Sequence, residues 1–175
     1  AEARGLIAEQ IKARGPEDVV MVENASTGVN TVLRHLEPPL TQGDKVLYLS
    51  CAYGMTQSVL RFLQNSVGIE LVMVGSRPQP VRLRLLRSIC PPTLTDTFFG
   101  GGQVDLVPTE FKSSDAVIAA VTATINEHGG PGSFAIGVIS HLSSVPAVVL
   151  PVARFCDALQ GVPVLVDGAR KYPAA

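Results

Sequence analysis

The strongest constraint on the fold is the segment 162–169 (VPVLVDGA), a run of aliphatic residues that leads directly into an aspartate. Such a run predicts a strand buried on both faces, as in parallel sheets that are covered by helices. Asp167 then stands at the carboxyl end of the strand, where open α/β sheets bind their ligands. Because an unpaired buried carboxylate is costly, Asp167 is expected to meet a cation or several hydrogen-bond donors. The alternative is an Asx turn or a helix cap.

The rest of the chain alternates helical and strand patterns. Helices are predicted at residues 5–14, 28–36, 53–65, 114–127 and 151–159, and strands at 19–22, 45–50, 69–74 and 134–140. Strands separated by helices imply an α/β fold, a three-layer sandwich whose mostly parallel sheet is covered on both faces. A length of 175 residues suits one domain with a real core.

Residues 75–103 do not fit this alternation. The segment holds four arginines, four prolines and a glycine triplet, and it shows no sustained period. Because structureless stretches of this length are uncommon inside compact domains, we predict an insertion that is foreign to the fold. A basic surface loop or lid is the alternative.

Charge and cysteine content restrict the class of protein. Fourteen basic and fifteen acidic residues give a net charge of -1, so nothing indicates a nucleic-acid partner or an anionic membrane surface. The uncharged stretch 134–153 contains two prolines and a histidine, which argues against a membrane span. Residues 1–14 are charged and amphipathic, unlike a signal peptide, and three scattered cysteines indicate neither disulfides nor zinc. A cytoplasmic location is expected.

A second segment with chemical potential is 23–30 (ENASTGVN), which follows a predicted strand and opens a predicted helix. Free N–H groups at a helix N-terminus, together with hydroxyl side chains, are suited to a phosphate group. The segment has neither the Walker lysine nor the G-x-G-x-x-G spacing, so nucleotides are poorly supported. An ordinary N-cap formed by Ser26 or Thr27 is the alternative.

Taken together, four segments resemble the class V aminotransferase family of fold type I pyridoxal-phosphate enzymes, and most closely its isopenicillin N epimerase-like branch. The segments are 24–36 (NASTGVNTVLRHL), 43–54 (GDKVLYLSCAYG), 139–152 (ISHLSS followed by VVLPV) and 161–169 (GVPVLVDGA). The resemblance implies that the cofactor is pyridoxal 5'-phosphate and that the chain is part of the large domain of such an enzyme.

The resemblance also implies roles for individual residues. The cofactor-binding residues would be Ala25, Ser26, Thr27, Tyr53, His141, Ser144 and Asp167. Asp167 would pair with the protonated pyridine nitrogen, residues 25–27 would hold the phosphate, and Tyr53 would lie against the ring. His141 and Ser144 follow a strand end in the region where relatives contact the ring hydroxyl. A purely structural histidine is the alternative for His141.

The chain departs from the family at several points. Arg170 follows Asp-Gly-Ala where relatives usually have His or Gln, and Cys51 stands where they often have His. The family's Schiff-base lysine lies well downstream of that motif, and the last residue here is Ala175. The chain is therefore expected to be an N-terminal fragment, without the catalytic lysine and the small C-terminal domain, and inactive alone.

For a complete protein the resemblance implies a homodimer that acts on an amino-acid substrate through a Cα carbanion. Epimerisation, transamination and elimination would all start from that species. A non-catalytic phosphate-binding or assembly module of the same fold is the alternative function.

Overall fold

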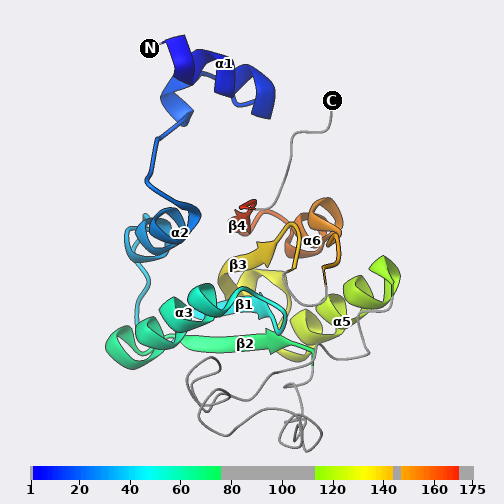
Figure 1. Ribbon diagram of the computed structural model, residues 1–175. Helices are drawn as coiled ribbons and strands as arrows, with labels where there is room; N and C mark the ends of the chain where they lie inside the picture. Colours follow the sequence, from blue (N-terminus) through cyan, green and yellow to red (C-terminus); the bar gives the residue numbers. More distant parts are fainter. Residues whose placement is uncertain (1, 76–112, 144–146, 170–175) are drawn as a thin grey trace, which may run out of the picture.

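The computed structural model describes residues 2–75, 113–143 and 147–169, which form one sheet with helices on both faces (Figure 1). The helices are α1 (Glu2–Ile11), α2 (Ala25–Arg34), α3 (Gly54–Val67), α5 (Ser114–Glu127) and α6 (Val152–Leu159), with short 3-10 turns η1 (Pro16–Asp18) and η4 (Pro131–Ser133). The strands are β1 (Lys45–Leu49), β2 (Glu70–Val74), β3 (Phe134–Ser140) and β4 (Val164–Asp167). The predicted insertion lies outside the described residues except for Gly75.

The four strands are all parallel and follow the order β2-β1-β3-β4. This arrangement confirms the predicted α/β fold with a parallel sheet. The chain moves outward from β1 to β2 and then returns to the other side of β1 to form β3. The carboxyl ends of β1 and β3 therefore flank a switch point of the strand order, the place where open α/β sheets bind ligands.

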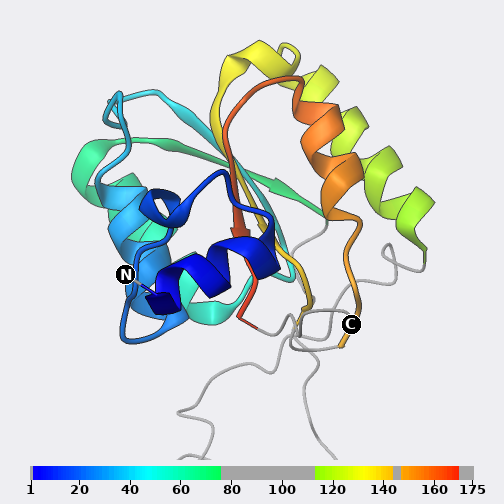
Figure 2. The ribbon, with the colours of Figure 1, turned by 90° about the horizontal axis from the view of Figure 1, so that it is seen from above.

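Alternation along the strands divides the core into two layers. Val46 and Tyr48 of β1 pack with α2 and α3 on one face of the sheet, whereas Leu47 and Leu49 pack with α5 and α6 on the other. Figure 2 shows the same three layers from above, with the two helix pairs on opposite sides of the strands. Because both faces are covered, β1 is almost completely buried, as its hydrophobic sequence requires.

Helix α6 packs very closely on β3. A Cβ atom built on Gly137 would collide with the Leu159 side chain and lie 3.0 Å from Cε1 of Phe155, two residues of α6 that are fully buried. Only a glycine lets the helix approach the strand this closely. This contact fixes the height of α6 above the sheet.

Both ends of α5 are closed by hydrogen bonds. The hydroxyl of Ser113 accepts a 3.1 Å hydrogen bond from the N–H of Ala116, and the N–H of Gly130 donates to the carbonyl of Ile125 over 2.9 Å. The observed bounds of α5 and of β3 are those predicted from the sequence.

Two predictions about strands are wrong. Residues 19–22 form no strand: Val20 and Met21 are 77% and 67% exposed, and the segment is an extended link between η1 and α2 (Figure 1). The pattern was apolar, but no strand of the described sheet pairs with it. The second error concerns β4, which was predicted to be buried on both faces. It is an edge strand of the described sheet, and Val166 is 40% exposed.

Candidate functional site

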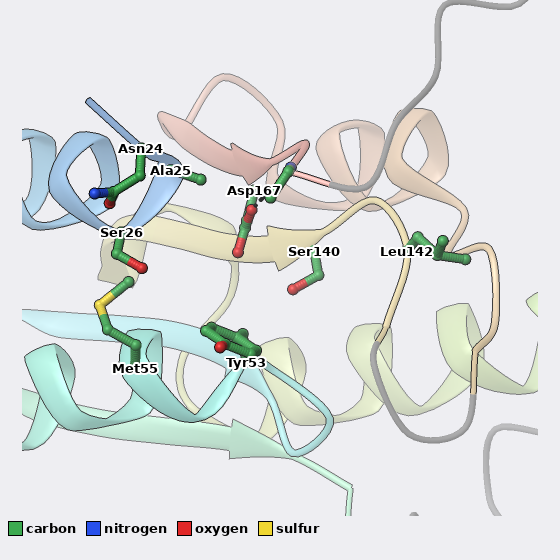
Figure 3. A pocket seen from close by; sticks show the side chains of 9 residues that line it. Asn24, Ala25, Ser26, Tyr53, Met55, Ser140, Leu142 and Asp167 are labelled. Carbon is green, nitrogen blue, oxygen red and sulfur yellow. Dashed lines mark hydrogen bonds between the residues drawn. The ribbon is translucent and has the colours of Figure 1, made fainter. Parts of the chain in front are cut away.

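A cavity of about 290 Å³ opens at the carboxyl edge of the sheet, on the face that α2 and α3 cover (Figure 3). Its lining comes from the ends of two strands, the starts of two helices and a loop. The lining residues are Asn24, Ala25, Ser26, Tyr53, Met55, Ser140, Leu142, Asp167 and Ala169. All four segments that carry the family resemblance, which are far apart in the sequence, therefore meet at one place.

Strand alternation explains why Ser140 and Asp167 face this cavity. Val138 of β3 and Leu165 of β4 pack on the α2–α3 side, and residues two positions further along point the same way. Ser140 and Asp167 are also direct partners in the parallel register of β3 and β4. The two polar side chains therefore stand side by side just beyond the apolar part of the sheet.

The start of α2 supplies free backbone donors. Asn24 is the N-cap, and its side-chain oxygen accepts a 2.8 Å hydrogen bond from the N–H of Thr27. Ala25 and Ser26 line the cavity, and no residue of the described segments engages their N–H groups. These two donors, at the positive end of the helix dipole, make the helix start suited to an anion.

The predicted phosphate cradle needs one change. The alternative N-cap was expected at Ser26 or Thr27, but Asn24 has that role. Because the Thr27 N–H already has a partner, and Thr27 does not line the cavity, the residues placed for an anion are Ala25 and Ser26.

Tyr53 is positioned by the start of the other helix on this face. It occupies the N-cap position of α3 and is 49% exposed, and Figure 3 shows its ring across the cavity from Asp167. Met55, in the first turn of α3, closes the side of the cavity next to Ser26. Together they provide a flat, partly apolar wall opposite the carboxylate.

Asp167 forms an Asx turn and also faces the cavity, so both interpretations offered by the sequence apply. Its Oδ1 accepts a 3.1 Å hydrogen bond from the N–H of Ala169, which is an Asx turn, and the carboxylate also faces the cavity. Among the described residues, no basic side chain lines the cavity or forms an ion pair with Asp167. The described part of the site thus offers a carboxylate to a donor on a ligand.

His141 contributes through its backbone. Its N–H donates to the carbonyl of Asp167 over 2.9 Å, and its carbonyl accepts from the N–H of Leu150 at the same distance. Its Nδ1 is buried without a hydrogen-bond partner in the described structure, and His141 does not line the cavity. Ser144, the other residue predicted for the ring hydroxyl, lies outside the described residues.

Cys51 lies two residues after β1 and is poorly suited to act as a nucleophile. Burial raises the pKa of its thiol from 9.0 to about 11, which leaves very little thiolate at neutral pH. No group of three or more His, Cys, Asp or Glu side chains that could hold a metal ion occurs in the described segments. No helix in the same segments is long and apolar enough to cross a membrane.

Several lining residues escaped the sequence analysis, namely Asn24, Met55, Ser140, Leu142 and Ala169. Two of these had a signal. Asn24 is a favourable N-cap residue directly before a helical pattern. Ser140 ends a predicted buried strand with a polar side chain, as Asp167 does.

Comparison with known proteins finds both sequence and structural relatives. No family model matches the chain. A candidate L-cysteine desulfhydrase of Oryza sativa subsp. japonica is 26% identical over 156 residues, which are 86% of this chain and 26% of that protein. The chain thus spans about a quarter of this curated relative.

Solved structures show the same spatial arrangement. The cystine C-S lyase C-DES, in complex with its product cysteine persulfide, matches with a TM-score of 0.62 and 21% identity over 98% of this chain and 36% of that one. The cysteine desulfurase CsdA of Escherichia coli matches with a TM-score of 0.65 and 16% identity over 98% and 35%. The chain therefore has the α/β fold of about one third of a fold type I pyridoxal-phosphate-dependent enzyme.

Proposed function

We propose that this chain forms the cofactor-binding part of a pyridoxal 5'-phosphate-dependent enzyme that acts on an amino acid. The observation that carries the proposal is the convergence of a strand-end carboxylate, a helix start and an aromatic ring on one cavity: Asp167, Ala25–Ser26 and Tyr53. These groups come from β4, α2 and α3, so only the folded chain brings them together.

The cavity fits the chemical parts of this cofactor. Pyridoxal phosphate joins a dianionic phosphate to a flat ring with a basic nitrogen, so its site needs an anion cradle, a flat wall and a carboxylate. The cavity has one of each, and its volume of about 290 Å³ is close to the lower end of small-molecule pockets, roughly 300 Å³. The chain also carries the polar groups at separate places on the wall, as a cofactor with two different ends requires (Figure 3).

Each group then has a defined task. The N–H groups of Ala25 and Ser26 bind the phosphate, with the Ser26 hydroxyl as a further donor. Asp167 accepts a charge-assisted hydrogen bond from the protonated ring nitrogen. Tyr53 covers one face of the ring, where stacking adds roughly 1 kcal/mol beyond burial. When bound, pyridoxal phosphate supplies a sink for negative charge at the substrate Cα.

The other predicted contacts enter the proposal with narrower roles. Thr27 contributes its hydroxyl alone, because its N–H is held by Asn24. His141 holds the Asp167 backbone in place. Ser144 is proposed for the ring hydroxyl, on the resemblance alone.

The names of the relatives favour sulfur chemistry over the isopenicillin N epimerase-like branch. A candidate L-cysteine desulfhydrase, a cystine C-S lyase and a cysteine desulfurase all have sulfur amino acids as substrates by name. We therefore propose that the whole protein, as a cytoplasmic homodimer, cleaves a C–S bond of a cysteine-like substrate. The raised pKa of Cys51 argues against transfer of sulfur to that thiol.

The test is binding of pyridoxine 5'-phosphate, an analogue without the aldehyde, so that surface lysines cannot trap it. Titration calorimetry should show specific binding to the wild-type chain. Asp167→Asn should weaken binding at least about tenfold, because it removes a charge-assisted hydrogen bond. Asp157→Asn, an exposed aspartate on α6 at the other face of the sheet, is the matched control and should leave the affinity unchanged.

Two results would contradict the proposal. One is the absence of saturable binding. The other is an affinity for inorganic phosphate equal to that for pyridoxine 5'-phosphate, together with no effect of Asp167→Asn. The second result would favour the phosphate-binding or assembly module of the same fold.

A further inference from the structure

A row of polar residues crosses the sheet directly beyond its apolar part. Tyr48, Val138 and Leu165 are register partners on β1, β3 and β4, and all three pack on the α2–α3 side. Two positions further along the strands, the residues of the same face are Ser50, Ser140 and Asp167. The sequence thus changes from apolar to polar on all three strands at the same level, which is where the cavity begins.

Ser140 is the member of this row that combines burial with access to the cavity. It is only 6% exposed, yet it lines the cavity, and Figure 3 shows its hydroxyl directed into the space below Asp167. No hydrogen bond within the described structure engages this hydroxyl. The hydroxyl of Ser140 is therefore available to donate a hydrogen bond to a group in the cavity.

The Asp167 carboxylate has one oxygen without a hydrogen-bond donor among the described residues. One of its carboxylate oxygens, Oδ1, is fixed by the N–H of Ala169, and no described residue donates to the other. A carboxylate held at one oxygen alone can still swing about that contact. Ser140 is the direct register partner of Asp167 on the neighbouring strand, and strands lie roughly 4.8 Å apart, so its hydroxyl is a side-chain donor beside the carboxylate.

We infer that Ser140 is a positioning residue for Asp167: its hydroxyl donates to the carboxylate once a ligand fills the cavity, and directs the carboxylate toward the ligand. The inference rests on the proposed function, in which Asp167 receives the ring N–H of pyridoxal phosphate. Filling the cavity removes the water that competes for the carboxylate, so the hydroxyl can donate to the carboxylate alongside the Ala169 N–H and the ligand. Ser50 cannot take this role, since β3 separates β1 from β4.

The test is a double-mutant cycle on the binding of pyridoxine 5'-phosphate to the full chain. Ser140→Ala should weaken binding on the order of tenfold, an effect typical of one hydrogen bond to a charged group. In the Asp167→Asn background the same change should have an effect of less than about twofold, because the charged acceptor is gone. Ser140→Thr keeps the hydroxyl and should restore most of the affinity.

Two controls separate positioning from a structural effect. Ser50→Ala removes the serine that directly follows β1, which does not line the cavity, and should leave the affinity unchanged. Competition by inorganic phosphate should be the same in the wild type and in Ser140→Ala, because the helix start that binds phosphate is untouched. If Ser140→Ala does not fold cooperatively, Ser140→Cys, which keeps the volume but donates weakly, should show the same loss.

The outcomes distinguish the inference from the function it rests on. Additive effects of Ser140→Ala and Asp167→Asn, or equal losses in Ser140→Ala and Ser140→Thr, would overturn the inference. If Asp167→Asn weakens binding and Ser140→Ala does not, the inference fails while the proposed function stands. If the wild-type chain does not bind pyridoxine 5'-phosphate, both fail.

Discussion

The backbone N–H of His141 donates a 2.9 Å hydrogen bond to the carbonyl oxygen of Asp167. This bond continues the pairing of β3 and β4 by one residue beyond Ser140, at the level where the cavity begins. The direction of the Asp167 side chain therefore depends on the backbone of His141, and the imidazole does not line the cavity.

This relationship predicts different effects for two substitutions of His141. His141→Ala keeps the N–H and should change the affinity for pyridoxine 5'-phosphate by less than about threefold. His141→Pro removes the donor and should weaken binding by more than about tenfold and lower stability. Calorimetric titration and urea unfolding measure both effects. Equal losses in the two variants would instead show that the imidazole contacts the ligand.

Asn24 allows the cap and the anion site to be tested separately. Asn24→Ala should lower the free energy of unfolding by about 1 kcal/mol, because Thr27 loses its 2.8 Å partner. Asn24→Asp keeps a cap and should retain stability, but its negative charge beside Ala25 should weaken phosphate binding about fivefold. Thermal unfolding and phosphate titration of both variants check this. Unchanged phosphate binding in Asn24→Asp would argue against an anion at this helix start.

Gly137 predicts a large cost for one methyl group. Gly137→Ala should lower the free energy of unfolding by about 1–3 kcal/mol, because the new Cβ collides with Leu159 and crowds Phe155. Gly132→Ala is the matched control, since a Cβ there meets no atom within 4 Å. Urea denaturation compares the two. A Gly137→Ala variant as stable as the wild type would mean that α6 can move away from β3 at little cost.

Cys51 predicts a slow reaction with alkylating reagents. A pKa raised from 9.0 to about 11 by burial lowers the thiolate fraction about a hundredfold at pH 8, relative to the unfolded chain. Iodoacetamide should therefore modify Cys51 far more slowly in the native protein than in urea. The unfolded thiol loses its proton from about pH 9, whereas the folded thiol keeps it until about pH 11. Native stability should consequently fall across this window, and less so in Cys51→Ala. Peptide mass mapping measures the labelling, and rapid native modification would contradict the burial argument.

The central strands of the sheet could be predicted from the sequence because their hydrophobic composition indicates that they are buried. KVLYL and FAIGVIS are mostly apolar between Lys45 at the start of the first and Ser140 at the end of the second, and such runs are typical of the centre of a parallel sheet. The same reasoning failed for residues 19–22, whose apolar pattern is equally strong but which have no partner strand in the described sheet. Strand formation depends on pairing, and a single segment does not encode its partner.

The site was predictable where a residue type has one chemical use at one place. Asp167 ends a strand and was identified from that position, whereas Tyr53 was identified from the family resemblance, and both line the cavity. Ser140 was missed because a serine at a strand end has many uses, and its value comes from its register with Asp167. Asn24 was missed because two hydroxyl residues beside it compete for the same cap.

The pairing of β1 with β3 has a consequence for how the molecule folds. It joins Lys45 to Phe134 and so closes a long loop of chain, which is the kind of contact that forms slowly. The cavity needs residues from Asn24 to Ala169, so it exists only after this closure. A ligand that needs the complete cavity will therefore bind only after β1 and β3 have paired. In a refolding experiment such a ligand should bind after the sheet has formed, so it should stabilise the folded sheet without directing its formation.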